Sequence, residues 1–200
     1  MANKFGGIEL DGVLGGYEIV NIPADKLPQD IASAVSEANN NPLLGATYNP
    51  LWYFGNAVVN GVNHLFIAED IRTTKNKDKS IVGLVINVPP GENAAKGEGA
   101  KVVQIIESAD LPEEVQLAFD TATKQLIGVS YKAVIYGGEQ TVRGTNHYIV
   151  CEAKGIYPNA QPYAVVMCIN IFEGQYSIVG IAPLKRTTNG DGLFGYAFSW

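Results

Sequence analysis

The sequence predicts an α+β fold built twice, with one helix packed on a four- to five-stranded antiparallel sheet in each of two tandem domains. Two observations carry this prediction. Asn63-His64 returns 83 positions later as Asn146-His147, and Leu27-Pro28 returns 84 positions later as Leu111-Pro112. Each half also places a helical spacing of apolar residues before several segments rich in β-branched and aromatic residues. We therefore expect one domain over residues 1–106 and a second over residues 107–200.

The register of 83 positions extends across most of both halves. Seven further pairs keep it: Gly45 and Gly128, Tyr48 and Tyr131, Tyr53 and Tyr136, Gly55 and Gly138, Val59 and Val142, Glu69 and Glu152, Asn87 and Asn170. One register over two long spans is hard to obtain by chance. A domain of about 90 residues is also large enough to bury a modest core of its own.

One amphipathic helix opens each copy. The apolar face of the first helix carries Leu27, Ile31, Ala34, Val35 and Ala38, and that of the second carries Leu111, Val115, Ala118, Phe119 and Ala122. Pro28 and Pro112 suit the first helical turn, where a missing N–H costs no hydrogen bond. The run from Asn39 to Pro42 ends the first helix.

Four strands follow each helix. Valine, isoleucine, threonine and tyrosine dominate these segments, and glycine or proline separates them. The expected strands are 46–54, 62–70, 80–88 and 100–106 in the first copy, and 129–136, 145–153, 163–171 and 175–182 in the second. Gly137-Gly138 and Glu173-Gly174 are interpreted as connections. Short connections favour an antiparallel meander with the helix across one face.

Composition narrows the function classes. Hydrophobic residues make up 46% of the chain and charged residues 17%, so the chain is able to bury a core. The net charge of −6 opposes nucleic acid binding, which depends on basic groups that displace phosphate counterions. No segment approaches the ~18 apolar residues of a membrane-spanning helix. The first residues lack the apolar stretch of a signal peptide, so a cytoplasmic protein and the mature form of a secreted one both remain open.

Candidate chemical groups are few. Cys151 and Cys168 both belong to the second copy, and we expect free, buried thiols rather than a cross-strand disulfide. His64 and His147 are equivalent residues of different copies, and no converging ligands accompany either one. No nucleophile–base arrangement is recognisable. We therefore expect neither an enzyme nor a metal or other cofactor.

One segment resembles a known family. Gln140-Thr141-Val142-Arg143-Gly144, followed by Thr145-Asn146, resembles the QxVxG signature of the cystatin superfamily. Leu14-Gly15-Gly16, ahead of the first helix, is similar to the glycine-containing N-terminal segment of the same family. The resemblance covers roughly residues 13–183 and implies two tandem cystatin-like domains, each a sheet wrapped on one helix.

The resemblance also implies a function, namely non-covalent inhibition of papain-like cysteine proteases by a wedge of three elements. The implied protease-binding residues are Gln140, Thr141, Val142, Arg143 and Gly144, with Gly15 and Gly16 as a second element. Such a wedge requires no bond to the catalytic cysteine, and glycine lets the backbone come close to the cleft wall.

The chain departs from the family pattern in both copies. The first copy has Ala57-Val58-Val59-Asn60-Gly61 in place of the signature, and its second hairpin, 88–91, lacks the usual tryptophan. The second hairpin of the second copy is 172–175. Gly61 and Gly144 also have a structural explanation, because a hairpin or bulge often requires a positive φ.

The two ends of the chain suggest an alternative function. Phe194, Tyr196, Phe198 and Trp200 alternate along the tail, and residues 1–16 are rich in glycine. The tail either docks on its own domain or anchors on a neighbouring subunit, since such aromatic residues are typical interface anchors. The alternative is therefore a non-inhibitory structural or protein-binding protein that self-assembles into a homo-oligomer through its termini.

Overall fold

A computed structural model describes residues 4–5, 8–9, 18–40, 46–58, 60–72 and 79–184. The chain divides into two compact units, and their main segments are Gly16–Glu107 and Ser108–Lys185. They are called here the N-terminal unit and the C-terminal unit. Met1–Gly15 groups with the C-terminal unit.

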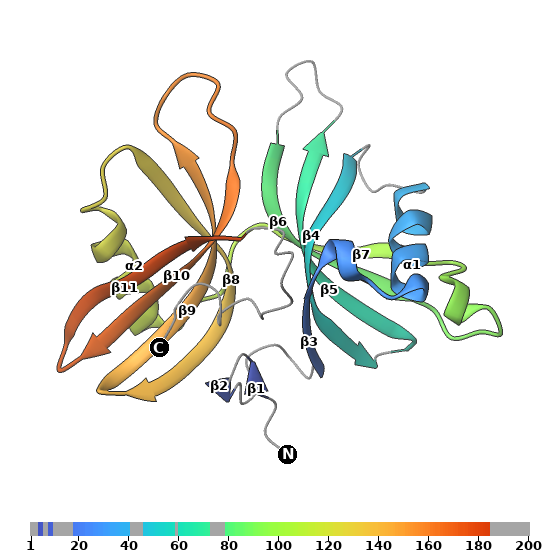
Figure 1. The fold of residues 1–200 in the computed structure, drawn as a ribbon, viewed down its shortest axis with the longest axis horizontal. Helices are drawn as coiled ribbons and strands as arrows, with labels where there is room; N and C mark the ends of the chain where they lie inside the picture. Colours follow the sequence, from blue (N-terminus) through green and yellow to red (C-terminus); the bar gives the residue numbers. More distant parts are fainter. Residues whose placement is uncertain are drawn as a thin grey trace. The chain divides into compact units, whose positions relative to one another are not determined.

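The N-terminal unit is a five-stranded antiparallel sheet with one α-helix (Figure 1). Its elements are β3 (Glu18–Pro23), η1 (Ala24–Lys26), α1 (Gln29–Asn40), β4 (Ala46–Val58), β5 (Val62–Arg72), β6 (Lys79–Val88), η3 (Ala94–Lys96) and β7 (Lys101–Ile106). The strand order β3-β4-β5-β6-β7 follows the chain, so every strand pairs with its neighbour in sequence.

Helix α1 forms and packs for the reasons that its sequence suggests. Its first hydrogen bond runs from the Ala32 N–H to the carbonyl of Pro28, and Ile31, Ala34 and Ala38 are buried. These side chains join a core with apolar residues of all strands (Ala46, Tyr48, Tyr53, Phe66, Ala68, Val82, Leu84, Ile86, Val88 and Val102, with Ile22 at its margin). The Asn39 side chain exchanges two hydrogen bonds with the Tyr48 backbone, at 2.9 and 3.0 Å, and so fixes the end of the helix to β4.

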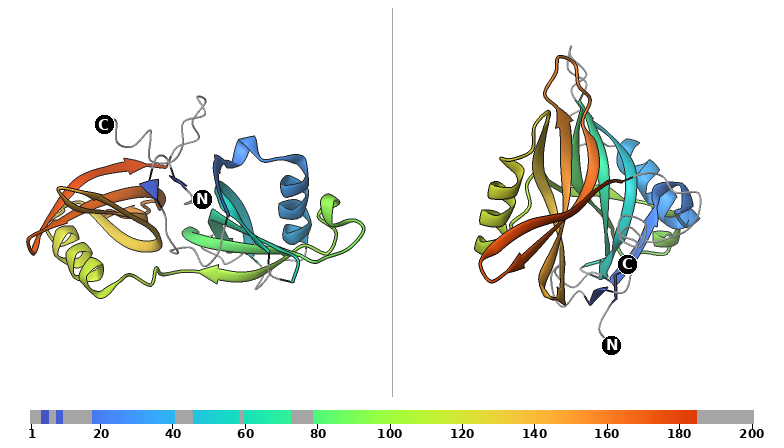
Figure 2. Two further views of the ribbon diagram at one scale, coloured as in Figure 1. Left: turned by 90° about the horizontal axis from the view of Figure 1, so that it is seen from below. Right: turned by 60° about the vertical axis from the view of Figure 1, so that its left-hand side comes forward.

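The C-terminal unit is a four-stranded antiparallel sheet with one helix (Figures 1 and 2). Its elements are α2 (Glu113–Thr123), β8 (Val129–Val142), β9 (Gly144–Gly155), β10 (Tyr163–Phe172) and β11 (Gln175–Pro183), in the order β11-β10-β9-β8. Val115, Ala118, Phe119 and Ala122 of α2 pack with apolar residues of the strands (Ala133, Ile149, Cys151, Ala153, Val165, Met167, Ile169 and Ile171). Two short strands, β1 (Lys4–Phe5) and β2 (Ile8–Glu9), pair with each other.

The sequence repeat is also a repeat of strand irregularities. The pairing of β4 with β5 shifts between Pro50 and Trp52 and again between Tyr53 and Gly55. The pairing of β8 with β9 shifts at the positions 83 residues later, between Ala133 and Ile135 and between Tyr136 and Gly138. Since a β-bulge is a specific local feature, its recurrence twice in the same register shows that the two sheets share one backbone plan.

The α+β class and the antiparallel sheets are confirmed, but two details of the expected strands are wrong. Gly137-Gly138 is not a connection. Strand β8 continues through it to Val142, because Gly138 adopts a φ of 113° at the bulge and the strand bends instead of ending. The sequence prediction also omitted β3, a six-residue strand before the first helix.

Both faces of each sheet are apolar. In β5 the consecutive side chains from His64 to Ala68 are all buried, and in β10 so are those from Ala164 to Ile169. Cys151 and Cys168 are buried and free, as expected, and burial raises the pKa of the Cys168 thiol to about 11. Among the described residues, no helix has the length and apolar character needed to cross a membrane.

Candidate functional site

The candidate residues Gln140 to Gly144 form the tip of the β8–β9 hairpin. The last strand pair joins Val142 to Gly144, so Arg143 is the turn. Gly144 has a φ of +83°, and a Cβ atom there would lie 2.4 Å from the carbonyl oxygen of Ile171 and 2.8 Å from Cβ of Phe172. The structure therefore brings the β8–β9 tip directly against the end of β10.

The β10–β11 turn lies beside this tip. Glu173 and Gly174 form the turn, with φ values of 50° and 72°. The Arg143 guanidinium carbon lies 5.1 Å from the centre of the Phe172 ring, a distance typical of a cation–π contact. The Asn170 side-chain amide donates to the Arg143 carbonyl (3.3 Å) and to the Asn146 side-chain carbonyl (2.8 Å). The two hairpins thus form one supported surface, which we call the C-terminal tip.

Gln140 is partly engaged inside the hairpin. Its Oε1 atom accepts a hydrogen bond of 3.0 Å from the Tyr148 hydroxyl. The Tyr148 side chain is buried, and burial raises the pKa of its hydroxyl, so the group is a stable donor. Thr141, Val142 and Arg143 are exposed, and Val142 keeps 44% of its surface accessible. The groups available to a partner are therefore the three residues of the turn, while Gln140 holds the base.

The N-terminal unit repeats the geometry of this tip with different chemistry. Gly61 has a φ of +106°, and a Cβ atom there would lie 2.2 Å from the carbonyl oxygen of Val88. The β4–β5 tip therefore meets the end of β6 and Pro89, which is the pairing of hairpins that the sequence suggested. Val58 is 83% exposed, and Asn60 occupies the position of Arg143. No cationic side chain stands at this tip among the described residues.

Four candidate contacts at the chain ends and two at the glycine segment lie outside the described residues. They are Phe194, Tyr196, Phe198 and Trp200 of the tail, and Gly15 and Gly16 ahead of β3. The structure therefore brings together Gln140 to Gly144 with the β10–β11 turn, and it supplies no position for the third element of the implied wedge.

The two histidines belong to a repeated buried pair that sequence reasoning missed. The Tyr53 hydroxyl lies 3.0 Å from Nδ1 of His64, and the Tyr136 hydroxyl lies 2.8 Å from Nδ1 of His147. Burial lowers the pKa of both histidines; for His147, the nearby carboxylate of Glu139 (3.7 Å) opposes this effect. The signal was available, because both members of each pair keep the 83-residue register. Their position inside the sheets fits a structural role.

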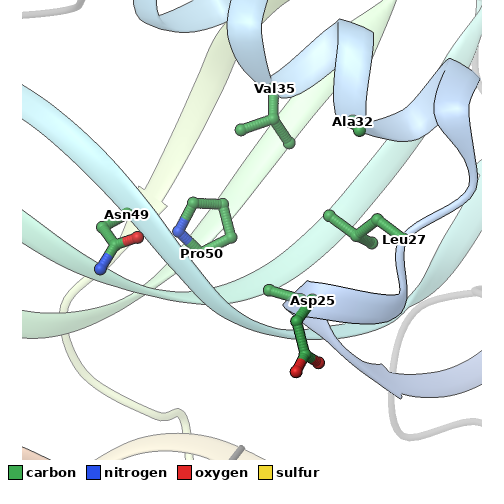
Figure 3. Close-up of a pocket in the computed structure, with 7 residues that line it drawn as sticks. Asp25, Leu27, Ala32, Val35, Asn49 and Pro50 are labelled. Atoms are coloured by element: carbon green, nitrogen blue, oxygen red, sulfur yellow. The ribbon is translucent and has the colours of Figure 1, made fainter.

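Small-molecule and metal chemistry find little support. Figure 3 shows a pocket of about 190 Å³ in the N-terminal unit, lined by Ala24, Asp25, Leu27, Ala32, Val35, Asn49 and Pro50. Ligand pockets usually measure about 300–1,000 Å³, so this one is small for an organic substrate. Within the described ranges, no three histidine, cysteine or acidic side chains gather closely enough to hold a metal ion.

Comparisons of the chain with protein-family models, with curated proteins and with solved structures give no match. The resemblance to cystatins therefore depends on the residues quoted above and on the geometry of the tips.

Proposed function

We propose that this chain is a tandem cystatin-like protein that binds a papain-like cysteine protease non-covalently through the C-terminal tip. One observation carries the proposal. The QxVxG-like turn and the second hairpin, which are 30 residues apart in sequence, lie side by side and support each other through Gly144, Arg143 and Phe172. A wedge that enters a cleft needs two such adjacent hairpin ends.

The fold of the N-terminal unit supports the proposal. Its elements run strand, helix and four further strands, and all five strands lie in chain order in one sheet packed on the helix. This is the arrangement that the resemblance implies, and it includes a strand that the resemblance required but the strand pattern did not show. The C-terminal unit repeats the helix and the four later strands.

The C-terminal tip is suited to binding because it is pre-shaped. Strand pairing continues to Val142 and Gly144, and Asn170 fixes the carbonyl of the turn residue. A rigid tip loses little conformational freedom on binding, so more of the contact energy becomes affinity. Exposed Val142 supplies apolar area for a cleft, and no nucleophile is needed.

The test is inhibition of papain in a peptide-hydrolysis assay. Val142→Glu places a charge on the exposed valine, and Val58→Glu is the control at the N-terminal tip. We expect Val142→Glu to weaken inhibition by on the order of 100-fold, or about 2.7 kcal/mol. Val58→Glu should leave the inhibition constant within about threefold, because only the C-terminal tip enters the cleft. A wild-type chain without inhibition at high micromolar concentration would refute the proposal.

Gly144→Glu is a less informative variant. A side chain at this position meets the backbone of Ile171 at a positive φ, so the hairpin itself must move. Loss of inhibition would then report a changed fold as readily as a lost contact. Val142 is exposed and leaves the fold intact, which makes it the better probe.

A second candidate function is a non-inhibitory scaffold that assembles through its termini. The hydrogen bond from Tyr148 to Gln140 favours it, since it gives the leading glutamine of the signature a role in the fold. This candidate predicts a large species in light scattering that disappears when residues 187–200 are removed. A strictly monomeric full chain would refute it.

A further inference from the structure

The C-terminal sheet lacks one strand of the shared plan. In the N-terminal unit, β3 precedes the helix and pairs with β4 at the edge of the sheet. The repeat register before the helices is 84, so residues 102–107 occupy the positions of β3 in the second copy. Those residues form β7 and pair with β6, from Asn87 with Lys101 to Gly83 with Ile106. The segment that would complete the second sheet instead completes the first.

This leaves a defined stretch of β8 without a strand partner on one side. Strand β3 pairs with Trp52, Tyr53, Gly55 and Asn56. The equivalent positions in β8 are Ile135, Tyr136, Gly138 and Glu139. Ahead of α2, the Ala109 N–H donates to the Ala133 carbonyl at 3.0 Å, so the lead-in to the helix closes the edge only up to Ala133. Among the described strands, β9 is the only one that pairs with β8. We call residues 135–139 the open edge.

Side-chain burial agrees with a missing strand. Tyr53, beside β3, is 0% exposed, whereas its equivalent Tyr136 is only partly buried. Both tyrosines make the same hydrogen bond to a histidine, so the difference lies in what surrounds the ring. An edge with unpaired N–H and carbonyl groups is also a template for unwanted strand pairing, and proteins usually cover it.

The structure points to an occupant within the same chain. Strand β2 contacts β8, and Met1–Gly15 groups with the C-terminal unit, although β3 belongs to the N-terminal unit. In the sequence, Ile8 and Leu10 alternate with Glu9, a pattern typical of an edge strand with one face on a core. We propose that residues 1–11 are the missing edge strand of the C-terminal sheet and cover the open edge of β8. The chain would thereby cross between units, since its first strand serves the second sheet.

The proposal is independent of protease binding. Residues 1–11 end before Leu14-Gly15-Gly16, and the open edge does not include Thr141, Val142 or Arg143. A chain that fails to inhibit papain can still use its first residues as a strand, and the reverse also holds.

Amide hydrogen exchange tests the proposal on three variants of the full chain. One lacks residues 2–11, one carries Ile8→Pro to remove a backbone donor, and the control carries Ala2→Pro. We expect the amides of residues 135–139 to exchange at least about 10-fold faster in the deletion and in Ile8→Pro, alone or together with the rest of the C-terminal sheet. Residues 52–56, covered by β3, should be unchanged in all three, and Ala2→Pro should match the wild type.

Two outcomes would overturn the proposal. Equal exchange of residues 135–139 in the wild type and the deletion would show that the first residues do not cover the edge. Protection that rises with protein concentration, together with a dimer in a sizing measurement, would show that a second copy covers it instead.

Discussion

The N-terminal and C-terminal units share a backbone plan and differ at one tip and one edge. Both have two bulges in the first long strand, a buried tyrosine–histidine pair and a 2.8 Å hydrogen bond between asparagine side chains, Asn87 to Asn63 and Asn170 to Asn146. The differences are the tip residues and the presence of β3. Residues that keep the register hold the fold, so a function is to be sought where the copies diverge.

The cores of the two units place their aromatic rings on different elements. Phe66 lies on β5 in the N-terminal core, and the equivalent position in β9 is Ile149. Phe119 lies on α2 in the C-terminal core, and the equivalent position in α1 is the half-buried Val35. One plan therefore accepts two distributions of volume, as packing rules allow when the total is kept.

The largest expected effect exploits this exchange. Phe119→Ala removes a buried ring from α2 and should lower the free energy of unfolding of the C-terminal unit by about 3–5 kcal/mol. Val35→Ala, at the equivalent position, should cost only about 1 kcal/mol because the valine is half-buried. Urea unfolding followed by residue-resolved hydrogen exchange separates the two units. Equal costs at both positions would show that the helices are packed alike.

The second effect should be equal in both units. Gly61→Ala and Gly144→Ala each place a Cβ at a positive φ and against a backbone carbonyl, so each should cost about 2–3 kcal/mol in strain and displacement. Gly174→Ala is the control, because its φ is also positive but nothing lies near its Cβ. Its cost should be about 1 kcal/mol. Unfolding midpoints in urea measure all three, and a cost at Gly61 or Gly144 no larger than at Gly174 would contradict the close approach of the hairpins.

The smallest effect concerns pH. Burial lowers the pKa of His64 and His147, so below about pH 6.5 the unfolded chain takes up protons that the folded chain does not. Stability is therefore complete above that pH and falls as the pH drops towards the lowered folded pKa, by up to about 1.4 kcal/mol per pH unit for each histidine.

The two units should differ in this slope. His147 pairs across the strands with Glu139, whose carboxylate favours the protonated ring, whereas His64 pairs with the neutral Asn56. We expect His64→Gln to flatten the slope of stability between about pH 7.5 and 5.5 more than His147→Gln does. Thermal unfolding at several pH values checks this. A slope that neither substitution changes would contradict a buried neutral role for the histidines.

Much of the fold could be predicted from local pattern. The apolar spacing from Leu27 to Ala38 gave the position of α1, and the β-branched segments gave eight strands, because both signals are local in sequence. Gly137-Gly138 misled the prediction, since glycine marks a bulge as readily as a turn. Strand β3 was missed because Glu18 to Pro23 is short and has little alternation; only its pairing with β4 makes it a strand.

The candidate site was predictable in its residues and not in its arrangement. The signature at Gln140 to Gly144 named a hairpin tip, but the contact of Arg143 with Phe172 depends on strand register across β8, β9 and β10. The tyrosine–histidine pairs and the open edge of β8 are likewise consequences of pairing. Such features join residues that are distant in sequence, so no window of sequence contains them.

The most direct measurement compares the two tips within one chain. Gln140→Ala, Thr141→Val and Arg143→Asn together make the C-terminal tip identical in sequence to Ala57–Gly61, while Gly144 and the strand register stay the same. If divergence between the copies carries the function, this chain should keep an unfolding midpoint close to wild type and inhibit papain on the order of 100-fold more weakly. Undiminished inhibition by the triple variant would contradict the account.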